Sequence, residues 1–123
     1  QDVSLIDARK GLLMFQQGHV PVLGIVENMS YFVCDGCGKR HEIFRYGGGR
    51  RTSEELGVPF LGEVPLDPQV TWGGDQGDPV VVSAPDSAAS KALREIALKV
   101  IAQLEATASQ RAPLPTLDLT GVG

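Results

Sequence analysis

The sequence is poor in cysteine and in aromatic side chains, and it has no long apolar run. Only two of its 123 residues are cysteines, which excludes a disulfide-stapled scaffold and favours a reducing, cytoplasmic location. The apolar runs have the length of single strands, so no membrane-spanning segment is expected. The first residues lack the basic and apolar regions of a secretory signal. The sequence therefore indicates neither membrane association nor export.

An excess of positive charge is also missing. Lys and Arg number 11 against 15 Asp and Glu, giving a formal net charge of −4, so binding to nucleic acid through phosphate neutralisation is not expected. No phosphate loop of the form G-x-x-x-x-G-K followed by Ser or Thr occurs, and no serine lies in a G-x-S-x-G motif. No catalytic residue is therefore assigned, and enzyme activity stays undecided.

What is present is the composition of one ordinary globular domain. Hydrophobic residues make up 42% of the chain and charged residues 21%, and this length supports one core but not two. The chain begins at Gln1, and its first residues already have a helical pattern. We therefore expect the sequence to be a piece of a longer polypeptide.

Two apolar segments predict a pair of buried parallel strands. Val20–Val26 and Val58–Val64 share five of seven positions at an offset of 38 residues, and near-continuous apolar runs such as Val20–Glu27 are typical of parallel sheets. Chance similarity between two buried strands is the alternative. Gly24 and Gly62 are then expected where a neighbouring helix or ligand leaves no room for a side chain. In such sheets ligands bind beyond the carboxyl ends of the strands.

The remaining segments predict helices and a small hairpin. A helix is expected over Asp2–Gln17, with a buried stripe of Val3, Ile6, Leu13 and Met14. Further predictions, in chain order, are strand pieces at residues 31–33 and 42–44, a helix at 50–56 closed by Gly57, a turn-rich stretch at 66–77, a short strand at 80–82, and an amphipathic helix with the stripe Leu93, Ile96, Ala97, Val100, Ile101 and Leu104. From Ser109 the chain is expected to form a flexible tail.

The two cysteines form a C-x-x-C motif, Cys34-Asp35-Gly36-Cys37, inside the predicted hairpin. A short turn of this kind directs two sulfurs at one metal, which favours metal binding. The residues leave four interpretations open: half of a zinc or iron–sulfur site shared between chains, a zinc site completed by His41 and another group, a dithiol redox pair, or two thiols without a role. A four-coordinate site needs more ligands than one pair supplies.

Asn28 ends the first buried strand, where its amide can both donate and accept a hydrogen bond. That suits the edge of a nucleobase at the end of a parallel sheet. An asparagine that turns or caps the chain is an equally good interpretation.

Together these residues resemble a known family. The match rests on Gln1–Gly11, the stretch Val20 to Ser30 that contains Glu-Asn-Met-Ser, the Cys34–Cys37 motif, the glycines 47–49, and Val58–Asp67. The chain resembles the C-terminal half of the Mrp/ApbC family of iron–sulfur cluster carrier ATPases, from residue 1 to about residue 105.

The resemblance implies an α/β fold of the deviant-Walker, MinD-like P-loop type. It divides the chain into residues 1–108, the C-terminal half of the ATPase domain, and a tail at residues 109–123. The family's phosphate loop, its Mg²⁺-binding residue and its switch aspartates would precede residue 1. ATP and Mg²⁺ are therefore expected only in a full-length parent, which we expect to be an ATPase.

The resemblance also implies a site and partners. Cys34 and Cys37 match the cysteines that hold a 4Fe-4S cluster between two subunits. Asn28 matches the position that faces the adenine, and Pro65, Leu66 and Asp67 match the loop on the other side of the base. The expected partners are a second copy of the chain and apo iron–sulfur acceptor proteins. A structural zinc module that stabilises a dimer, and a nucleotide switch without a metal, are the alternative functions.

Overall fold

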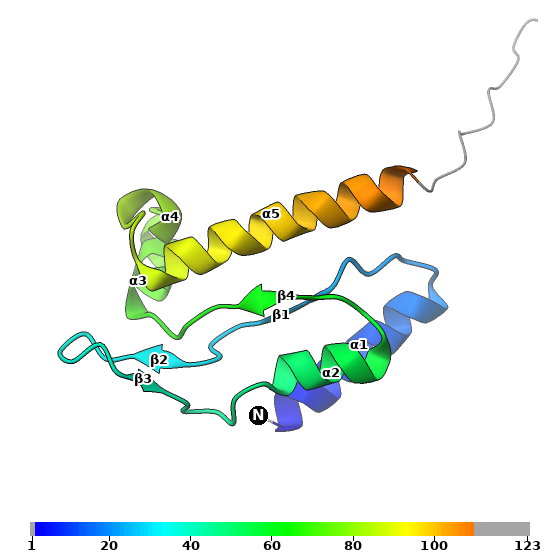
Figure 1. The fold of residues 1–123 in the computed structure, drawn as a ribbon, viewed down its shortest axis with the longest axis horizontal. Coiled ribbons are helices and arrows are strands. Elements are labelled where there is room, and N and C mark those ends of the chain that lie inside the picture. Colours follow the sequence, from blue (N-terminus) through cyan, green and yellow to red (C-terminus); the bar gives the residue numbers. More distant parts are fainter. Residues whose placement is uncertain (1, 110–123) are drawn as a thin grey trace, which may run out of the picture.

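The structure, a computed structural model, describes residues 2–109 (Figure 1). The expected tail, apart from Ser109 at the end of the last helix, lies outside the described residues. The elements in chain order are α1 (Asp2–Gln17), β1 (Ile25–Glu27), β2 (Phe32–Val33), β3 (Arg40–His41), α2 (Gly48–Leu56), β4 (Phe60–Glu63), α3 (Pro68–Gln76), α4 (Val80–Ser83) and α5 (Ala88–Ser109).

The predicted parallel pair is confirmed. Strands β1 and β4 run parallel, with Val26 opposite Gly62 and Glu27 opposite Glu63. Both strands are shorter than expected, because regular pairing is limited to the three or four residues at the carboxyl end of each apolar run. Hydrogen bonds continue the ladder at both ends, from the Ile25 N–H to the Pro59 carbonyl at 2.8 Å and from the Val64 N–H to the Glu27 carbonyl at 2.9 Å.

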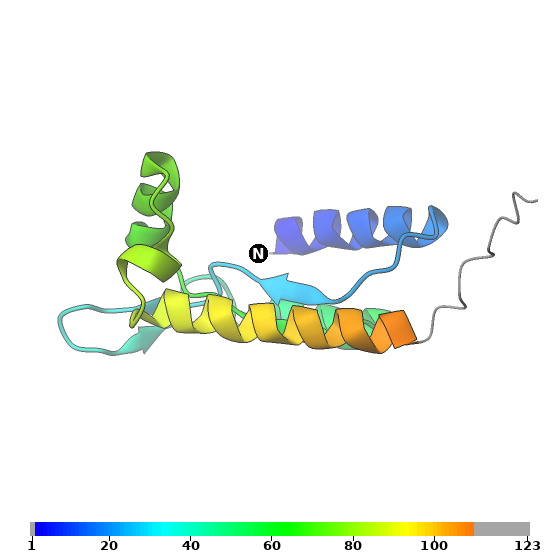
Figure 2. The ribbon, with the colours of Figure 1, turned by 90° about the horizontal axis from the view of Figure 1, so that it is seen from above.

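Helices cover both faces of this small sheet. Helix α5 packs along β4 on one face, and α2 packs on β1 and β4 on the other, with α1 against α2 (Figure 1). Seen from above, α1 is displaced toward the β1 edge of the sheet (Figure 2). The main buried cluster lies between β4 and α5 and contains Leu61, Val64 and Ile96, with Leu93 and Val100 packed against it.

Both strand glycines lie where a side chain does not fit, as predicted. A Cβ atom on Gly62 would lie 2.7 Å from Cγ1 of Ile96, in the helix above the sheet. A Cβ atom on Gly24 would lie 2.6 Å from both Cγ of Leu61 and the Pro59 carbonyl oxygen. The close approach at Gly24 is thus made by the neighbouring strand segment, and that at Gly62 by a helix.

The buried stripe predicted for α1 is wrong. Leu12 is buried and Leu5 is half-buried, whereas the predicted residues are exposed: Val3, Ile6, Leu13 and Met14. The helix has apolar residues on more than one side, so its pattern does not select a face; contact with α2 does. In α5 the outcome is mixed, because Leu93, Ile96 and Val100 face the sheet while Ile101 and Leu104 are about half exposed.

The segment between β4 and α5 is more helical than its composition predicted. The turn-rich stretch contains α3, which begins with Asp67 as the capping residue and Pro68 in its first turn. Residues 80–82 form part of α4 and not a strand, since they pack against α5 and have no strand to pair with in the described chain. None of the helices within residues 2–109 is long and apolar enough to cross a membrane.

Candidate cysteine hairpin and strand-end cavities

The two cysteines lie in the turn of a two-stranded hairpin, as predicted. Strands β2 and β3 pair antiparallel, with Phe32 opposite His41 and Val33 opposite Arg40. Two bonds close the turn: the Cys34 N–H donates to the Lys39 carbonyl at 3.0 Å, and the Gly38 N–H donates to the Cys34 carbonyl at 2.7 Å. Gly38 has a φ of 68°, which favours glycine. Because this turn is so tight, the second strand begins at residue 40 and not at residue 42.

Both thiols are free and reachable from solvent. Cys34 is half-buried and Cys37 is exposed. The pKa of the Cys34 thiol is lowered, first by hydrogen bonds from the backbone N–H groups of Cys37 and Gly36 and then by the Cys37 side chain. Donors aimed at the sulfur favour its thiolate, which is the form that binds metals and reacts.

A third protein ligand does not stand beside the two thiols in the described chain. Within residues 2–109 no group of three or more His, Cys, Asp and Glu side chains is arranged to hold a metal ion. His41 stands on β3 with its ring tilted against Phe32, the two centroids 6.5 Å apart. The interpretation in which His41 completes a zinc site is therefore not supported, and one copy offers two thiolates.

The hairpin continues the ladder of the main sheet. Beyond β1, the Ser30 N–H donates to the Val64 carbonyl at 3.0 Å, and the Leu66 N–H donates to the Tyr31 carbonyl at 2.6 Å. Phe32 and Leu66 then form a parallel bridge. The chain after β1 thus runs alongside residues 64–66, which follow β4, so the cysteine hairpin is attached to the carboxyl end of the sheet.

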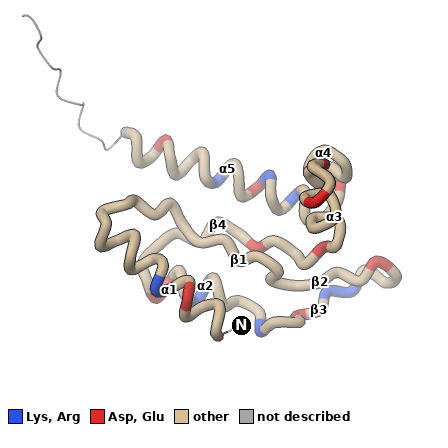
Figure 3. Tube along the Cα trace, turned by 180° about the vertical axis from the view of Figure 1, so that it is seen from behind, with Lys and Arg blue, Asp and Glu red and all other residues tan. Residues whose placement is uncertain are grey.

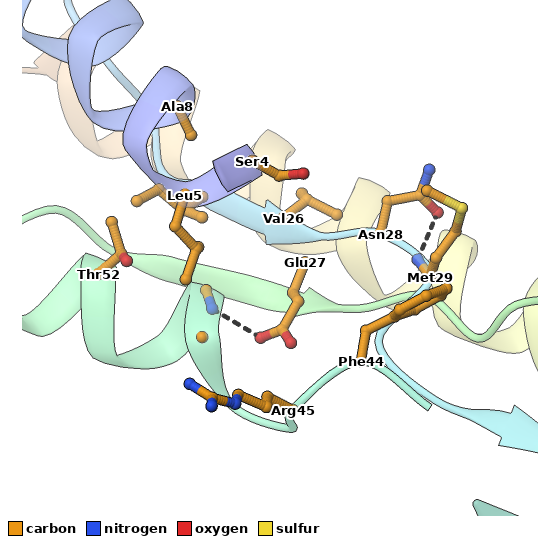
Figure 4. A pocket seen from close by; sticks show the side chains of 13 residues that line it. Ser4, Leu5, Ala8, Val26, Glu27, Asn28, Met29, Phe44, Arg45 and Thr52 are labelled. Carbon is orange, nitrogen blue, oxygen red and sulfur yellow. Dashed lines mark hydrogen bonds between the residues drawn. The ribbon is translucent and has the colours of Figure 1, made fainter. Parts of the chain in front are cut away.

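Asn28 lies at this end of the sheet and is exposed, at the mouth of a cavity of about 490 Å³ between α1, β1 and α2 (Figure 4). Its side-chain oxygen accepts the Met29 N–H at 2.9 Å, while Figure 4 draws its amide nitrogen pointing away from that bond. Met29 has a φ of 53°, which marks a sharp turn here. Asn28 therefore turns the chain with its side-chain oxygen, while its side-chain nitrogen points away from that bond.

Pro65, Leu66 and Asp67 line a different cavity, of about 360 Å³, together with Phe32 and Trp72 among others. The Asp67 carboxylate already accepts the Gln69 N–H at 2.9 Å as the cap of α3. We expected Asn28 and the segment 65–67 to flank one crevice. The structure places them in separate cavities, because the backbone ladder of residues 30–31 with 64–66 runs between the two segments.

Two charged residues that the sequence did not single out organise this region. Glu27, at the end of β1, accepts the Gly49 N–H at 2.8 Å and the Ser30 hydroxyl at 3.2 Å, which attaches the start of α2 to the sheet (Figure 4). Arg40, on β3, pairs with Glu63 of β4. Figure 3 marks the basic residues of the hairpin and the acidic residues near the end of β4. A charged residue closing an apolar strand was the available signal for Glu27.

Known proteins with similar sequences support the resemblance to iron–sulfur cluster carriers. The family description "ParA: NUBPL iron-transfer P-loop NTPase" matches residues 1–101. The chain is 52% identical to an iron-sulfur cluster carrier protein of Synechocystis, over 88% of this chain and 31% of that protein. It is 47% identical to an Arabidopsis thaliana iron-sulfur protein required for mitochondrial NADH dehydrogenase, over 85% of this chain and 34% of the relative. The chain thus spans about a third of the length of these curated relatives.

A solved structure agrees on the fold. A nucleotide-binding protein of Archaeoglobus fulgidus, determined in complex with ADP, has a TM-score of 0.54 and 32% sequence identity, covering 65% of this chain and 32% of its own. The predicted α/β fold with a small parallel sheet between helices is thereby confirmed. The chain belongs to the NUBPL-type family of iron-transfer P-loop NTPases.

Proposed function

We propose that the chain supplies one half of the cargo site of an iron–sulfur cluster carrier. Cys34 and Cys37 of one copy and the same two cysteines of a second copy would hold a 4Fe-4S cluster between them. One observation carries this proposal: two solvent-reachable thiols share a tight turn, and the described chain brings no third ligand to them. Iron–sulfur clusters are usually held by four thiolates, so two copies make up the complete set.

The position of the thiols suits transfer as well as binding. They stand in the turn of a hairpin, away from the hydrophobic core between β4 and α5. An acceptor's thiolates can therefore approach the iron. Transfer is then ligand exchange, in which each incoming thiolate replaces one Cys34 or Cys37 thiolate and no electron changes hands. The hydrogen bonds that lower the pKa of Cys34 make its sulfur a better leaving ligand and keep it ready to bind again.

Nucleotide binding is proposed only for a longer polypeptide that contains the family's phosphate loop. There, Asn28 would meet the base with its outward-facing amide nitrogen, while its oxygen stays bonded to the Met29 N–H. Pro65, Leu66 and Asp67 would border the base from the neighbouring cavity only after a change in the loop, since Asp67 now caps α3. ATP and Mg²⁺ would then control how two copies meet.

Anaerobic reconstitution with iron and sulfide tests the proposal. We expect the visible absorption of a 4Fe-4S cluster and about four irons per two chains, lost in Cys34→Ser. His41→Gln is the matched control in the same hairpin and keeps the cluster. A chain that retains about one zinc per two chains and forms no chromophore would instead be a structural zinc module. Iron uptake unchanged by Cys34→Ser would refute both.

A further inference from the structure

The base of the cysteine hairpin is closed by one side chain, that of Arg40. Its guanidinium carbon lies 3.7 Å from the ring centre of Tyr31 and 4.7 Å from that of Tyr46. Tyr31 directly precedes β2, and Tyr46 follows β3 on the way to α2. The segments that enter and leave the hairpin therefore both contact the Arg40 guanidinium. The stacking of a guanidinium on the face of an aromatic ring is an attractive interaction.

The same guanidinium is bonded to the main sheet. Nη2 of Arg40 donates to Oε2 of Glu63 at 3.2 Å, and the Glu63 side chain is only 13% exposed. The other Arg–Glu pair, Arg9 with Glu55, has partners that are 41% and 52% exposed. An ion pair with one sheltered partner is less screened by water and salt than a fully exposed one. We therefore expect the Arg40–Glu63 pair to stabilise the fold around it more than the Arg9–Glu55 pair does.

The guanidinium of Arg40 stays protonated and positively charged. Partial desolvation lowers the pKa of Arg40, but the hydrogen bond and charge of Glu63, together with Tyr46 and Tyr31, raise this pKa overall.

The two strands of the hairpin are held in different ways. The β2 side is attached by backbone bonds, from Leu66 to Tyr31 and through the bridge of Phe32 with Leu66. Among the hydrogen bonds of residues 2–109, only that of Arg40 with Glu63 joins β3 to β4. Glu63 is the last residue of β4, directly before the segment 64–66 that holds β2. Arg40 thus completes a closed loop of contacts around the base of the hairpin.

We propose that Arg40 is a positioning residue that locks the cysteine hairpin against the end of β4. This inference rests on the proposed function: by fixing the hairpin, Arg40 sets where Cys34 and Cys37 stand when two copies share a cluster. Without the lock all four thiolates remain, so a cluster still forms. The hairpins then tilt, the four sulfurs depart from their common geometry, and the cluster is lost faster. Lysine keeps the charge but cannot replace Arg40, because it lacks the flat guanidinium face that lies on the rings of Tyr31 and Tyr46.

The first test uses the metal-free 123-residue chain and measures backbone amide exchange by NMR. In Glu63→Gln, which removes the charge from the bond, and in Arg40→Lys, which removes the flat contact with the two tyrosine rings, we expect the amides of Cys34 and Leu66 to exchange about 10-fold faster. Arg9→Lys is the matched control, because the Arg9 side chain has the same 41% exposure as that of Arg40, and it should leave both rates unchanged.

The amide of Val64, which bonds the Glu27 carbonyl inside the ladder, reports whether the fold survives each substitution. If Arg40→Lys also speeds exchange at Val64, that substitution has disturbed the sheet itself. The exchange rates of Cys34 and Leu66 in Glu63→Gln then decide whether the lock exists. The variant that carries both substitutions should show less than the sum of the two single effects, because both weaken the same attachment of the hairpin. Unchanged rates at Cys34 and Leu66 in a folded variant overturn the lock.

The second test uses the reconstituted chain. Arg40→Lys should take up as much iron as the parent chain but lose it to a chelator roughly 10-fold faster, because the guanidinium contacts with the two tyrosine rings are lost. The visible circular dichroism of the cluster should change with it, which a loss of overall stability alone does not explain. Equal chelator rates and spectra overturn the positioning role. If the parent chain itself takes up no cluster, the proposed function fails, and amide exchange still decides whether Arg40 locks the hairpin.

Discussion

The parallel pair β1–β4 and the cysteine hairpin lie end to end, yet they are held by opposite means. The parallel pair depends on close packing, with Gly24 against a neighbouring strand and Gly62 beneath Ile96 of α5. The hairpin has two short strands, half-exposed residues and one cation at its base. Stability therefore resides in the sheet, and ligand chemistry in the hairpin. Substitutions should therefore affect one without the other, and the predictions below are ordered by their expected effect on unfolding.

The largest effect is expected for Gly24→Ala. The new Cβ would lie 2.6 Å from a backbone oxygen, that of Pro59, which cannot move without breaking the strand pair. We expect a loss of about 2–3 kcal/mol in the free energy of unfolding, measured with urea.

Gly11→Ala is the control for this substitution, since nothing lies within 4 Å of a Cβ at Gly11 in α1. It should stabilise the chain by up to about 1 kcal/mol, because alanine favours a helix more than glycine does. If Gly24→Ala is no less stable than the parent chain, close packing does not hold the sheet.

A smaller effect is expected for Glu27→Gln, at the junction of the two regions. The amide keeps the size of the side chain but weakens the bonds from the Gly49 N–H and the Ser30 hydroxyl. We expect a loss of about 1 kcal/mol in the free energy of unfolding, since a charged acceptor is lost near the start of a helix. Asp7→Asn is the control, because its contact with Lys10 is on the exposed surface. Equal stability of both variants would show that Glu27 does not join α2 to the sheet.

Almost no effect on unfolding is expected for Cys34→Ser in the metal-free chain. The thiol lies outside the hydrophobic core between β4 and α5, so the free energy of unfolding should stay within error of that of the parent chain. The same variant should lose all cluster binding. A large loss of stability would mean that the hairpin is part of the folded core and that the two regions are not separate.

The smallest effect concerns the pH dependence of the Cys34 thiol. Its pKa is lower in the folded chain, because of the N–H groups of residues 37 and 36. The resulting contribution to stability is present above the ordinary thiol pKa and is lost as the pH falls through the lower folded value. In Cys37→Ser, which keeps both N–H groups, Cys34 should be alkylated faster in the folded chain than in urea at neutral pH. The difference should vanish well above the ordinary pKa; its absence at neutral pH contradicts the prediction.

Features that depend on a few adjacent residues could be predicted from the amino-acid sequence. The motif Cys34-Asp35-Gly36-Cys37 predicted a tight turn, and Gly38 supplies the positive φ that closes it. The apolar runs around Gly24 and Gly62 predicted two parallel strands, because such runs are typical of strands buried on both faces. These signals are local, because a turn or a single strand depends on the conformational preferences of residues that are adjacent in the chain.

Which surfaces meet became clear from the folded chain alone. It selected the Leu5–Leu12 face of α1, made residues 80–82 helical, and placed Asn28 and Asp67 in separate cavities. It also brought Arg40 to Glu63, which are 23 residues apart in the chain. These outcomes escape sequence analysis because burial and ion pairing depend on partners distant in sequence. An apolar or charged residue indicates that it can be buried or paired, and the packed neighbours determine where.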